Sequence, residues 1–212
     1  MRCVKVASEE IILRTYLILT ACLLTFAPAF TLAQPAPAQV LLKTAYGEIE
    51  IVLYLDRAPV TAGNFLRLVE GGHLDGGSFY RSVTNANDNG SPRIEVIQGG
   101  LNGVSAPFPP IRHESTLETG ISHEDGVVSM ARGEVGTASS EFFICIGDQP
   151  GLDHGQPRNA DEQGFAAFGR VTRGMDVVRA INAAETASDS DSEYTQGQII
   201  AEPVVIFSAE VL

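Results

Sequence analysis

The sequence contains no tryptophan, only three cysteines, and few basic residues for its length of 212. Cys3, Cys22 and Cys145 can form neither a disulfide framework nor the cysteine pairs of a zinc site. Fourteen lysines and arginines are outnumbered by 26 aspartates and glutamates, so the net charge is −12. Because phosphate backbones and anionic lipids attract basic surfaces, nucleic acid is excluded as an expected partner. Cys145 lies in an apolar run, which predicts a buried thiol in a strand.

The first 33 residues have the features of a secretory signal. Basic residues precede an uncharged stretch over 15–33, and Thr31 and Ala33 are the small residues that a signal peptidase reads. We therefore expect export to the periplasm, cleavage after Ala33, a spacer over 34–39 and one domain over 40–212. Two alternatives remain open. The stretch is nearly long enough to stay as a membrane anchor, and residues 19–22 are similar to a lipobox, with Cys22 as the lipidated residue.

The rest of the chain alternates between short apolar runs and turns. Helices are expected at 59–70, which begins at Pro59 and ends before two glycines, and at 175–184. Many short strands with only two helices indicate a closed antiparallel barrel, which leaves no exposed sheet edge. Segment 186–193 is expected to be a solvated acidic loop, with a calcium site as the less favoured alternative. The expected strands are 40–44, 49–55, 78–83, 93–98, 126–131, 141–146, 165–171 and 203–212.

Six motifs in this order resemble those of the cyclophilin family of peptidyl-prolyl cis-trans isomerases. The resemblance spans roughly residues 40–212, and the shared order makes it specific. It implies a mostly β fold, a closed eight-stranded antiparallel β-barrel capped by two α-helices, with a proline-peptide groove on its outer surface. It also implies a monomer without cofactor or metal that acts on proline-containing polypeptide clients. The motifs are 60–65, 78–81 (Ser-Phe-Tyr-Arg), 96–100 (Val-Ile-Gln-Gly-Gly), 126–131, 140–144 (Ser-Glu-Phe-Phe-Ile), and 152–153 with 168–171.

The chemistry expected of such an isomerase needs a hydrogen-bond donor beside an apolar pocket. Rotation about an X-Pro bond is slow because amide resonance opposes it, and a donor to the prolyl nitrogen stabilises the twisted state. Arg81 carries a permanently charged fork of donors, and the resemblance gives it this catalytic role, with Gln98 beside it. For Phe143, the alternative that its side chain packs only in the core, and not in the pocket, remains open. The matched substrate-binding positions are Val96, Ala131, Arg132, Glu141, Phe143, Leu152 and Phe165.

The sequence departs from the family pattern at several positions near the expected site. Residues 84–92 look like an inserted, turn-rich loop. Glu95 stands where the family has a pocket aromatic, and Gly151 replaces a tryptophan, which lowers the expected affinity for cyclosporin-like ligands. Tyr80 replaces a histidine, and Arg132 replaces an asparagine.

Glu141 replaces the glutamine of the Ser-Gln-Phe-Phe motif. We expect its carboxylate to lie near Arg81, to pair with the guanidinium and to tune activity, so that Glu141→Gln leaves the rate unchanged or raises it.

Two other functions are kept as alternatives. Glu95 and Glu141 suggest a cyclophilin-fold chaperone that binds proline segments with weak or no catalysis. A metal enzyme is suggested by His113 next to Glu114 and by the His-Glu-Asp run at 123–125. The metal alternative is the weaker one, because no His-Glu-x-x-His spacing is present.

Overall fold

The computed structural model describes residues 37–187, 190 and 192–212. The expected signal peptide, its cleavage site and Cys22 lie outside these residues. In the described part, the helices are α2 (Pro59–Glu70), α3 (Thr116–Thr119) and α4 (Met175–Asn182), with 3-10 turns η1 (Pro150–Leu152) and η2 (Glu193–Thr195). The strands are β1 (Gln39–Thr44), β2 (Gly47–Leu53), β3 (Ser78–Val83), β4 (Val96–Gly100), β5 (Val127–Met130), β6 (Phe142–Cys145), β7 (Ala166–Arg173), β8 (Thr186–Ala187) and β9 (Ile199–Val211).

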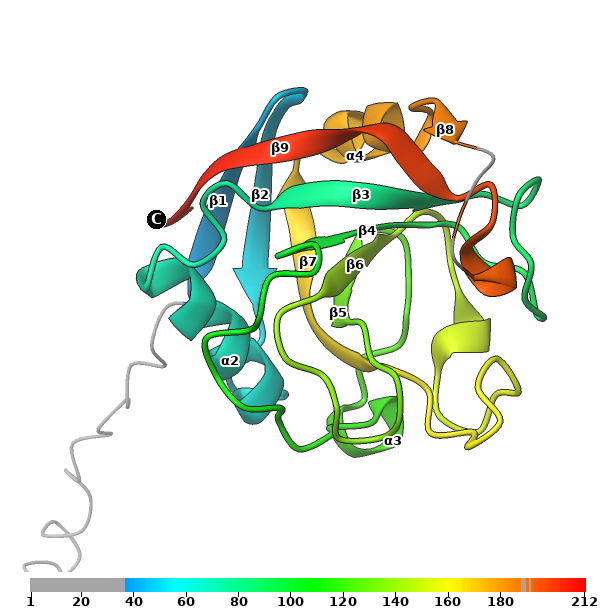
Figure 1. Ribbon diagram of the computed structural model, residues 1–212. Helices are drawn as coiled ribbons and strands as arrows, with labels where there is room; N and C mark the ends of the chain where they lie inside the picture. Colours follow the sequence, from blue (N-terminus) through cyan, green and yellow to red (C-terminus); the bar gives the residue numbers. More distant parts are fainter. Residues whose placement is uncertain (1–36, 188–189, 191) are drawn as a thin grey trace, which may run out of the picture. The chain divides into compact units, whose positions relative to one another are not determined.

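Eight strands form a closed antiparallel barrel (Figure 1). Their order is β1-β2-β7-β5-β6-β4-β3-β9, and the pairing of β1 with β9 closes the ring. The two-residue strand β8 pairs with β9 outside this ring. The predicted eight-stranded barrel is therefore confirmed. Closure leaves none of these eight strands as a free edge, which protects the sheet from pairing with other chains.

The structure corrects several expected boundaries. β4 begins at Val96 rather than at 93, because the Ile94 N–H donates to the Asp88 carboxylate instead of to a neighbouring strand. Gln39, assigned to the spacer, is the first residue of β1. The segment expected to be an acidic loop begins with β8, and β9 begins four residues earlier than expected. A third, one-turn helix, α3, follows Ser115, whose side chain accepts from the Glu118 N–H.

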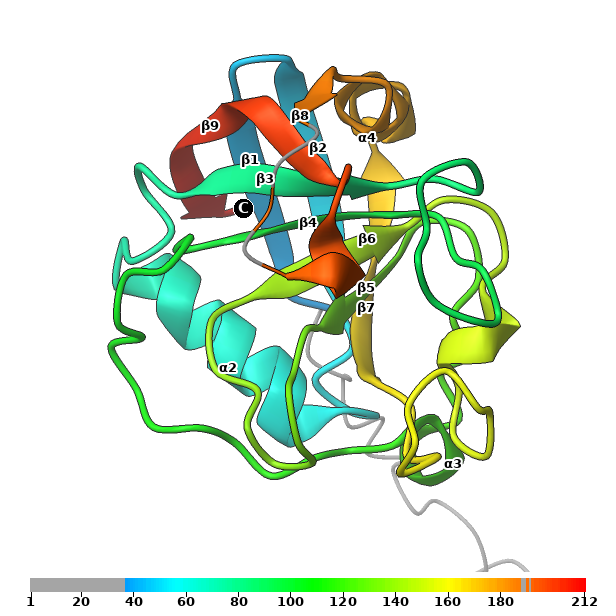
Figure 2. The same ribbon diagram turned by 45° about the vertical axis from the view of Figure 1, so that its right-hand side comes forward.

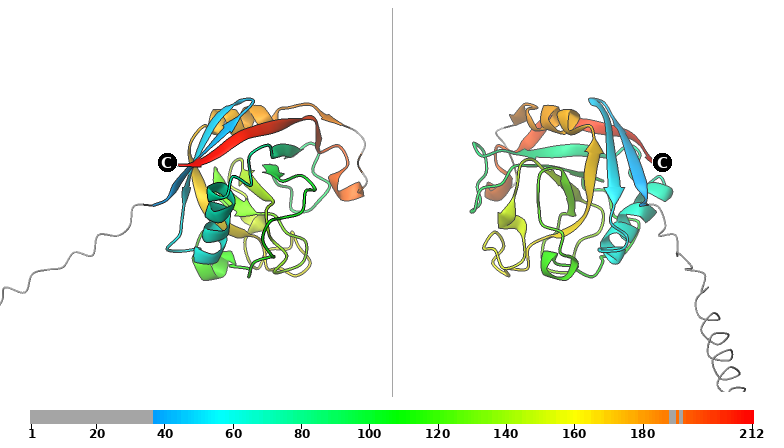
Figure 3. Two further views of the ribbon diagram at one scale, coloured as in Figure 1. Left: turned by 60° about the vertical axis from the view of Figure 1, so that its left-hand side comes forward. Right: turned by 180° about the vertical axis from the view of Figure 1, so that it is seen from behind.

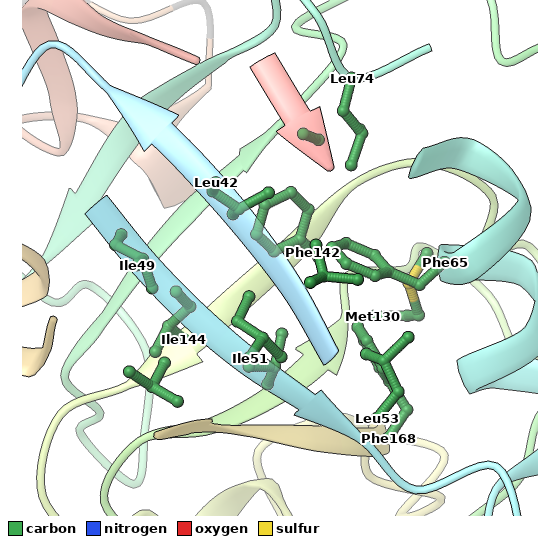
Figure 4. Packing of buried hydrophobic residues seen from close by; sticks show 14 of the residues in the cluster. Leu42, Ile49, Ile51, Leu53, Phe65, Leu74, Met130, Phe142, Ile144 and Phe168 are labelled. Atoms are coloured by element: carbon green, nitrogen blue, oxygen red, sulfur yellow. The ribbon is translucent and has the colours of Figure 1, made fainter. Parts of the chain in front are cut away.

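The core fills the inside of the barrel, and α2 and α4 lie on opposite sides of it (Figures 2 and 3). From α2, the Phe65 ring packs against Phe142 and Phe168, with centroids 5.1 and 5.0 Å away (Figure 4). Burying one such side chain contributes roughly 2–3 kcal/mol. From α4, Val178 and Ile181 are fully buried. No helix among the described residues is long and apolar enough to cross a bilayer.

A glutamate from a distant loop caps the start of α2. Pro59 occupies the first turn, and Ala58 at the N-cap offers no side-chain acceptor. The buried Glu114 carboxylate instead accepts from the N–H groups of Val60, at 3.2 Å, and Thr61, at 2.8 Å. Glu114, which the sequence suggested as part of a metal site, thus satisfies the unpaired N–H donors of a helix N-terminus.

Candidate active site

A cavity of about 200 Å³ lies on the outer face of the barrel, beside β3, β4 and β6. It brings together eight of the nine predicted site residues, all except Glu141, and adds three that the sequence did not indicate. The lining residues are Arg81, Ile94, Val96, Gln98, Ala131, Arg132, Phe143, Leu152, Asn159, Phe165 and Tyr194.

The apolar floor of this cavity is a second hydrophobic cluster, separate from the barrel core. Successive side chains of β6 alternate, so Phe142 and Ile144 face the core while Phe143 and Cys145 face outward into this cluster. Phe143 is therefore a pocket residue, and its ring meets Phe165 edge to face at 5.3 Å. The Cys145 thiol is fully buried and free, and burial raises its pKa, as expected for a structural thiol.

Arg81 is held at the edge of the cavity by two glutamines. It lies on β3 opposite Gln98 of β4, and its Nη1 donates to Gln98 Oε1 at 2.9 Å. Its Nε and Nη2 donate to Oε1 of the buried Gln198, at 2.9 and 2.6 Å. Three of its five N–H donors are thus used within the described residues, which leaves one on each terminal nitrogen for a ligand. Gln198 lies 117 positions from Arg81 and was not among the residues that the sequence indicated.

Arg132 lines the cavity, but its polar atoms are already occupied. Its guanidinium donates to both carboxylate oxygens of Asp161 at 2.8 Å and to the carbonyl groups of Gly133 and Gly164. The hydrogen bonds from Arg132 lower the pKa of Asp161 to about 2. The guanidinium also lies 5.3 Å from the centroid of the Phe165 ring. The Arg132 side chain therefore supports the apolar wall and has no donor left for a substrate.

The two glutamates that depart from the family pattern lie outside the cavity lining. Glu95 precedes Val96, the first residue of β4, and it does not line the cavity, whereas Ile94, Val96 and Gln98 do. Glu141 was expected to pair with Arg81, and this prediction is wrong. Its carboxylate accepts instead from the Tyr80 hydroxyl at 2.6 Å and from the Leu101 N–H at 3.0 Å.

Tyr194, which follows the expected acidic loop, forms the remaining wall of the cavity. Its ring centroid lies 5.1 Å from the Arg81 guanidinium carbon, within the range of a cation–π contact. Its hydroxyl accepts from Arg158 at 2.9 Å. Arg158 also makes a bidentate ion pair with Asp88 of the inserted loop, at 2.7 and 2.8 Å. The insertion over 84–92 is therefore connected to the wall of the site.

His123, which the sequence also suggested as part of a metal site, belongs to a hydrogen-bond network next to the cavity. Its Nδ1 lies 2.7 Å from Asp153 Oδ1 and its Nε2 lies 3.0 Å from Ser129 Oγ. This arrangement resembles a Ser-His-Asp triad, but Ser129 is fully buried, so its hydroxyl cannot meet a substrate. The network fixes Asp153, which follows Leu152 of the pocket. Within the described residues, no three histidine, cysteine or acidic side chains are grouped as a metal site.

Comparisons with known proteins agree on one family. The family described as "Cyclophilin type peptidyl-prolyl cis-trans isomerase/CLD" matches residues 39–211. Peptidyl-prolyl cis-trans isomerase A of Dickeya dadantii is 34% identical over 202 residues, which cover 93% of this chain and 94% of that protein. A crystal structure of a cyclophilin-type isomerase of Cryptosporidium parvum has a TM-score of 0.63 and 18% identity, covering 84% of this chain and 98% of that one. The same protein, crystallised in the presence of the dipeptide Ala-Pro, gives a TM-score of 0.62 at 18% identity, with 82% and 98% covered.

Proposed function

The chain belongs to the cyclophilin-type peptidyl-prolyl cis-trans isomerases, and we propose that it uses Arg81 and the adjoining apolar cavity to accelerate X-Pro rotation during the folding of exported proteins. The observation that carries this proposal is the position of the Arg81 guanidinium. Two glutamines hold it at the edge of an apolar cavity, and two of its N–H donors are left for a ligand. The expected clients are polypeptides that contain proline.

The proposed reaction breaks no covalent bond. The proline ring would enter the apolar part of the cavity, formed by Val96, Phe143 and Leu152. As the C–N bond twists, the prolyl nitrogen loses its resonance and its lone pair accepts a hydrogen bond from Arg81. This contact exists only in the twisted state, so it lowers the barrier instead of tightening substrate binding. A rate increase on the order of 10⁵ requires about 7 kcal/mol, which the contact, positioning and desolvation supply together.

The alternative of a chaperone without catalysis is no longer supported by the observation that suggested it. It depended on Glu95 and Glu141 replacing residues of the pocket wall, and neither side chain lines the cavity. A metal is not needed for this reaction, and we expect full activity in the presence of a chelator.

Arg81→Ala is the test of the proposed function. We expect it to remove most isomerase activity on a proline tetrapeptide, while the affinity for Ala-Pro changes much less, because the proposed contact forms in the transition state. Arg81→Lys should be nearly as inactive, since an ammonium group lacks the planar fork of donors. Arg173→Ala removes an exposed arginine from β7 and serves as the control. A folded Arg81→Ala variant with wild-type turnover would falsify the proposal.

Export is tested separately by the mass of the protein made in a bacterial host. The proposed signal predicts a mature chain that begins at or near Gln34 and is found in the periplasmic fraction. Intact-mass spectrometry of each fraction distinguishes the three cases. A diacylglyceryl adduct on Cys22, or a full-length chain in the membrane fraction, would show that the protein stays tethered.

A further inference from the structure

Two of the departures from the family pattern, Tyr80 and Glu141, contact each other beside the cavity. The Tyr80 hydroxyl donates to Glu141 Oε2 at 2.6 Å and accepts from Gln98 Nε2 at 2.7 Å. The other end of the Gln98 amide, Oε1, accepts from Arg81 Nη1 at 2.9 Å. A continuous chain of hydrogen bonds therefore connects the Glu141 carboxylate to the Arg81 guanidinium.

An irregularity in β3 brings the middle of this chain together. Phe79 pairs with Gly99 and Arg81 pairs with Gln98, so two steps along β3 match one step along β4, and Tyr80 is the extra residue of a β-bulge. On a regular strand, neighbouring side chains point to opposite faces. A bulge changes their direction, and here both Tyr80 and Arg81 reach Gln98.

The Glu141 end of the chain is fixed by the backbone around it. Its Oε1 accepts from the Leu101 N–H at 3.0 Å. Gly100 has a φ of +145°, and a Cβ at this position would lie 2.5 Å from Glu141 Oε2, so a larger residue here would displace the carboxylate. Burial and the hydrogen bond to Glu141 raise the pKa of Tyr80 far above its usual range, so its hydroxyl stays protonated and remains a donor.

The chemical character of the two ends determines the direction of every hydrogen bond between them. A guanidinium can only donate, so the Gln98 amide must present its oxygen to Arg81. The Gln98 NH₂ then faces Tyr80, whose hydroxyl must donate onward, and a carboxylate can only accept. We infer that Glu141 is a positioning residue for the isomerase reaction, which acts through Tyr80 and Gln98 to hold the Arg81 guanidinium in its catalytic orientation.

Replacing the carboxylate with an amide would remove this directional control. An amide at position 141 can donate to the Tyr80 hydroxyl, which would then donate to Gln98 Oε1 and turn the Gln98 NH₂ toward the donors of Arg81. This opposes the earlier expectation, drawn from the sequence, that Glu141→Gln leaves the rate unchanged or raises it. The inference rests on the proposed catalytic role of Arg81.

The test compares Glu141→Gln, Tyr80→Phe and the double variant in the full-length protein. Because each single change interrupts the oriented chain of hydrogen bonds that ends on Arg81, we expect kcat on a proline tetrapeptide to fall by about three- to tenfold. The KM, and the affinity for Ala-Pro measured by NMR titration, should change by less than about twofold, because the apolar pocket is untouched. The double variant should be no slower than the slower single variant, because both changes interrupt the same chain.

Glu70→Gln, which removes an exposed carboxylate at the end of α2, is the control for charge and should keep wild-type kcat. Circular dichroism melting establishes that each variant is folded. Wild-type kcat in Glu141→Gln, losses that multiply in the double variant, or a loss confined to Ala-Pro affinity would each overturn the inference. Arg81→Ala is measured in the same assay. If that variant is inactive while Glu141→Gln is unaffected, only the inference fails, and if it is active, the proposed function itself fails.

Discussion

At the scale of single residues, Tyr194 is the most informative addition to the site. Its side chain is 45% exposed, so it contributes little to the fold. Its ring nevertheless lies over the Arg81 guanidinium and closes one side of the cavity. An aromatic ring placed in this way both limits the movement of the guanidinium and extends the apolar surface offered to a peptide.

We therefore predict that Tyr194→Ala lowers kcat/KM on a proline tetrapeptide by about three- to tenfold, as expected for the loss of a cation–π contact and of a pocket wall. Tyr194→Phe keeps the ring and loses only the hydroxyl that accepts from Arg158, so it should retain more than half of the activity. Tyr46→Ala is the matched control, because Tyr46 is similarly exposed but lies in the β1–β2 turn. Equal activity of Tyr194→Ala and Tyr46→Ala would rule out a role for this ring.

The sequence identified the residues of the site that lie in or near its recognisable motifs and missed those that lie outside them. Arg81, Gln98 and Phe143 belong to strands whose alternation and motifs can be read locally. Gln198 and Tyr194 reach the site from the far end of the chain. No periodicity marks them, because their positions depend on how the barrel closes and not on local sequence.

At the scale of elements, the inserted loop over 84–92 supports the site. The Asp88 carboxylate and the Arg158 guanidinium are almost completely buried and form a bidentate pair. Asp88 also accepts from the N–H groups of Gly90 and Ile94. Burial opposes the charge of Asp88, but these hydrogen bonds outweigh it and lower its pKa. The loop therefore holds both Ile94 and, through Arg158, Tyr194 at the cavity.

Asp88→Asn should destabilise the protein by about 3 kcal/mol, because it leaves the Arg158 charge buried without its partner. Urea denaturation measures this loss, and Asp56→Asn, at an exposed aspartate, is the control.

The destabilisation caused by Asp88→Asn should depend on pH with a definite sign. The pKa of Asp88 is lowered by folding, so its contribution is complete above the unfolded value of about 3.9 and is lost as the pH falls through the folded pKa. Wild type and variant should converge in this acid range. A difference that does not shrink as the pH falls below the unfolded value would contradict the assignment.

At the scale of the whole molecule, the barrel was predictable because many short strands with turns and few helices have few stable arrangements. The pairing that closes the barrel was not predictable, since it depends on β1 pairing with both β2 and β9. Within the described residues, every strand of the ring comes from Gln39–Val211. The closed sheet thus requires β1.

Two truncations test this division of the chain. A protein that begins at residue 37 should fold and keep the isomerase activity of the full-length chain, because the barrel and all cavity residues are retained.

A protein that begins at residue 46 lacks β1, so β2 and β9 become open edges and the buried side chains of Val40 and Leu42 are lost. These two residues alone contribute roughly 3–6 kcal/mol by burial, which is comparable to the total stability of about 5–15 kcal/mol expected for a domain. The shorter protein should therefore show no cooperative thermal transition by circular dichroism and no activity. If the shorter protein melts cooperatively, or if the longer one is unfolded, the closure of the barrel by β1 is not what stabilises this domain.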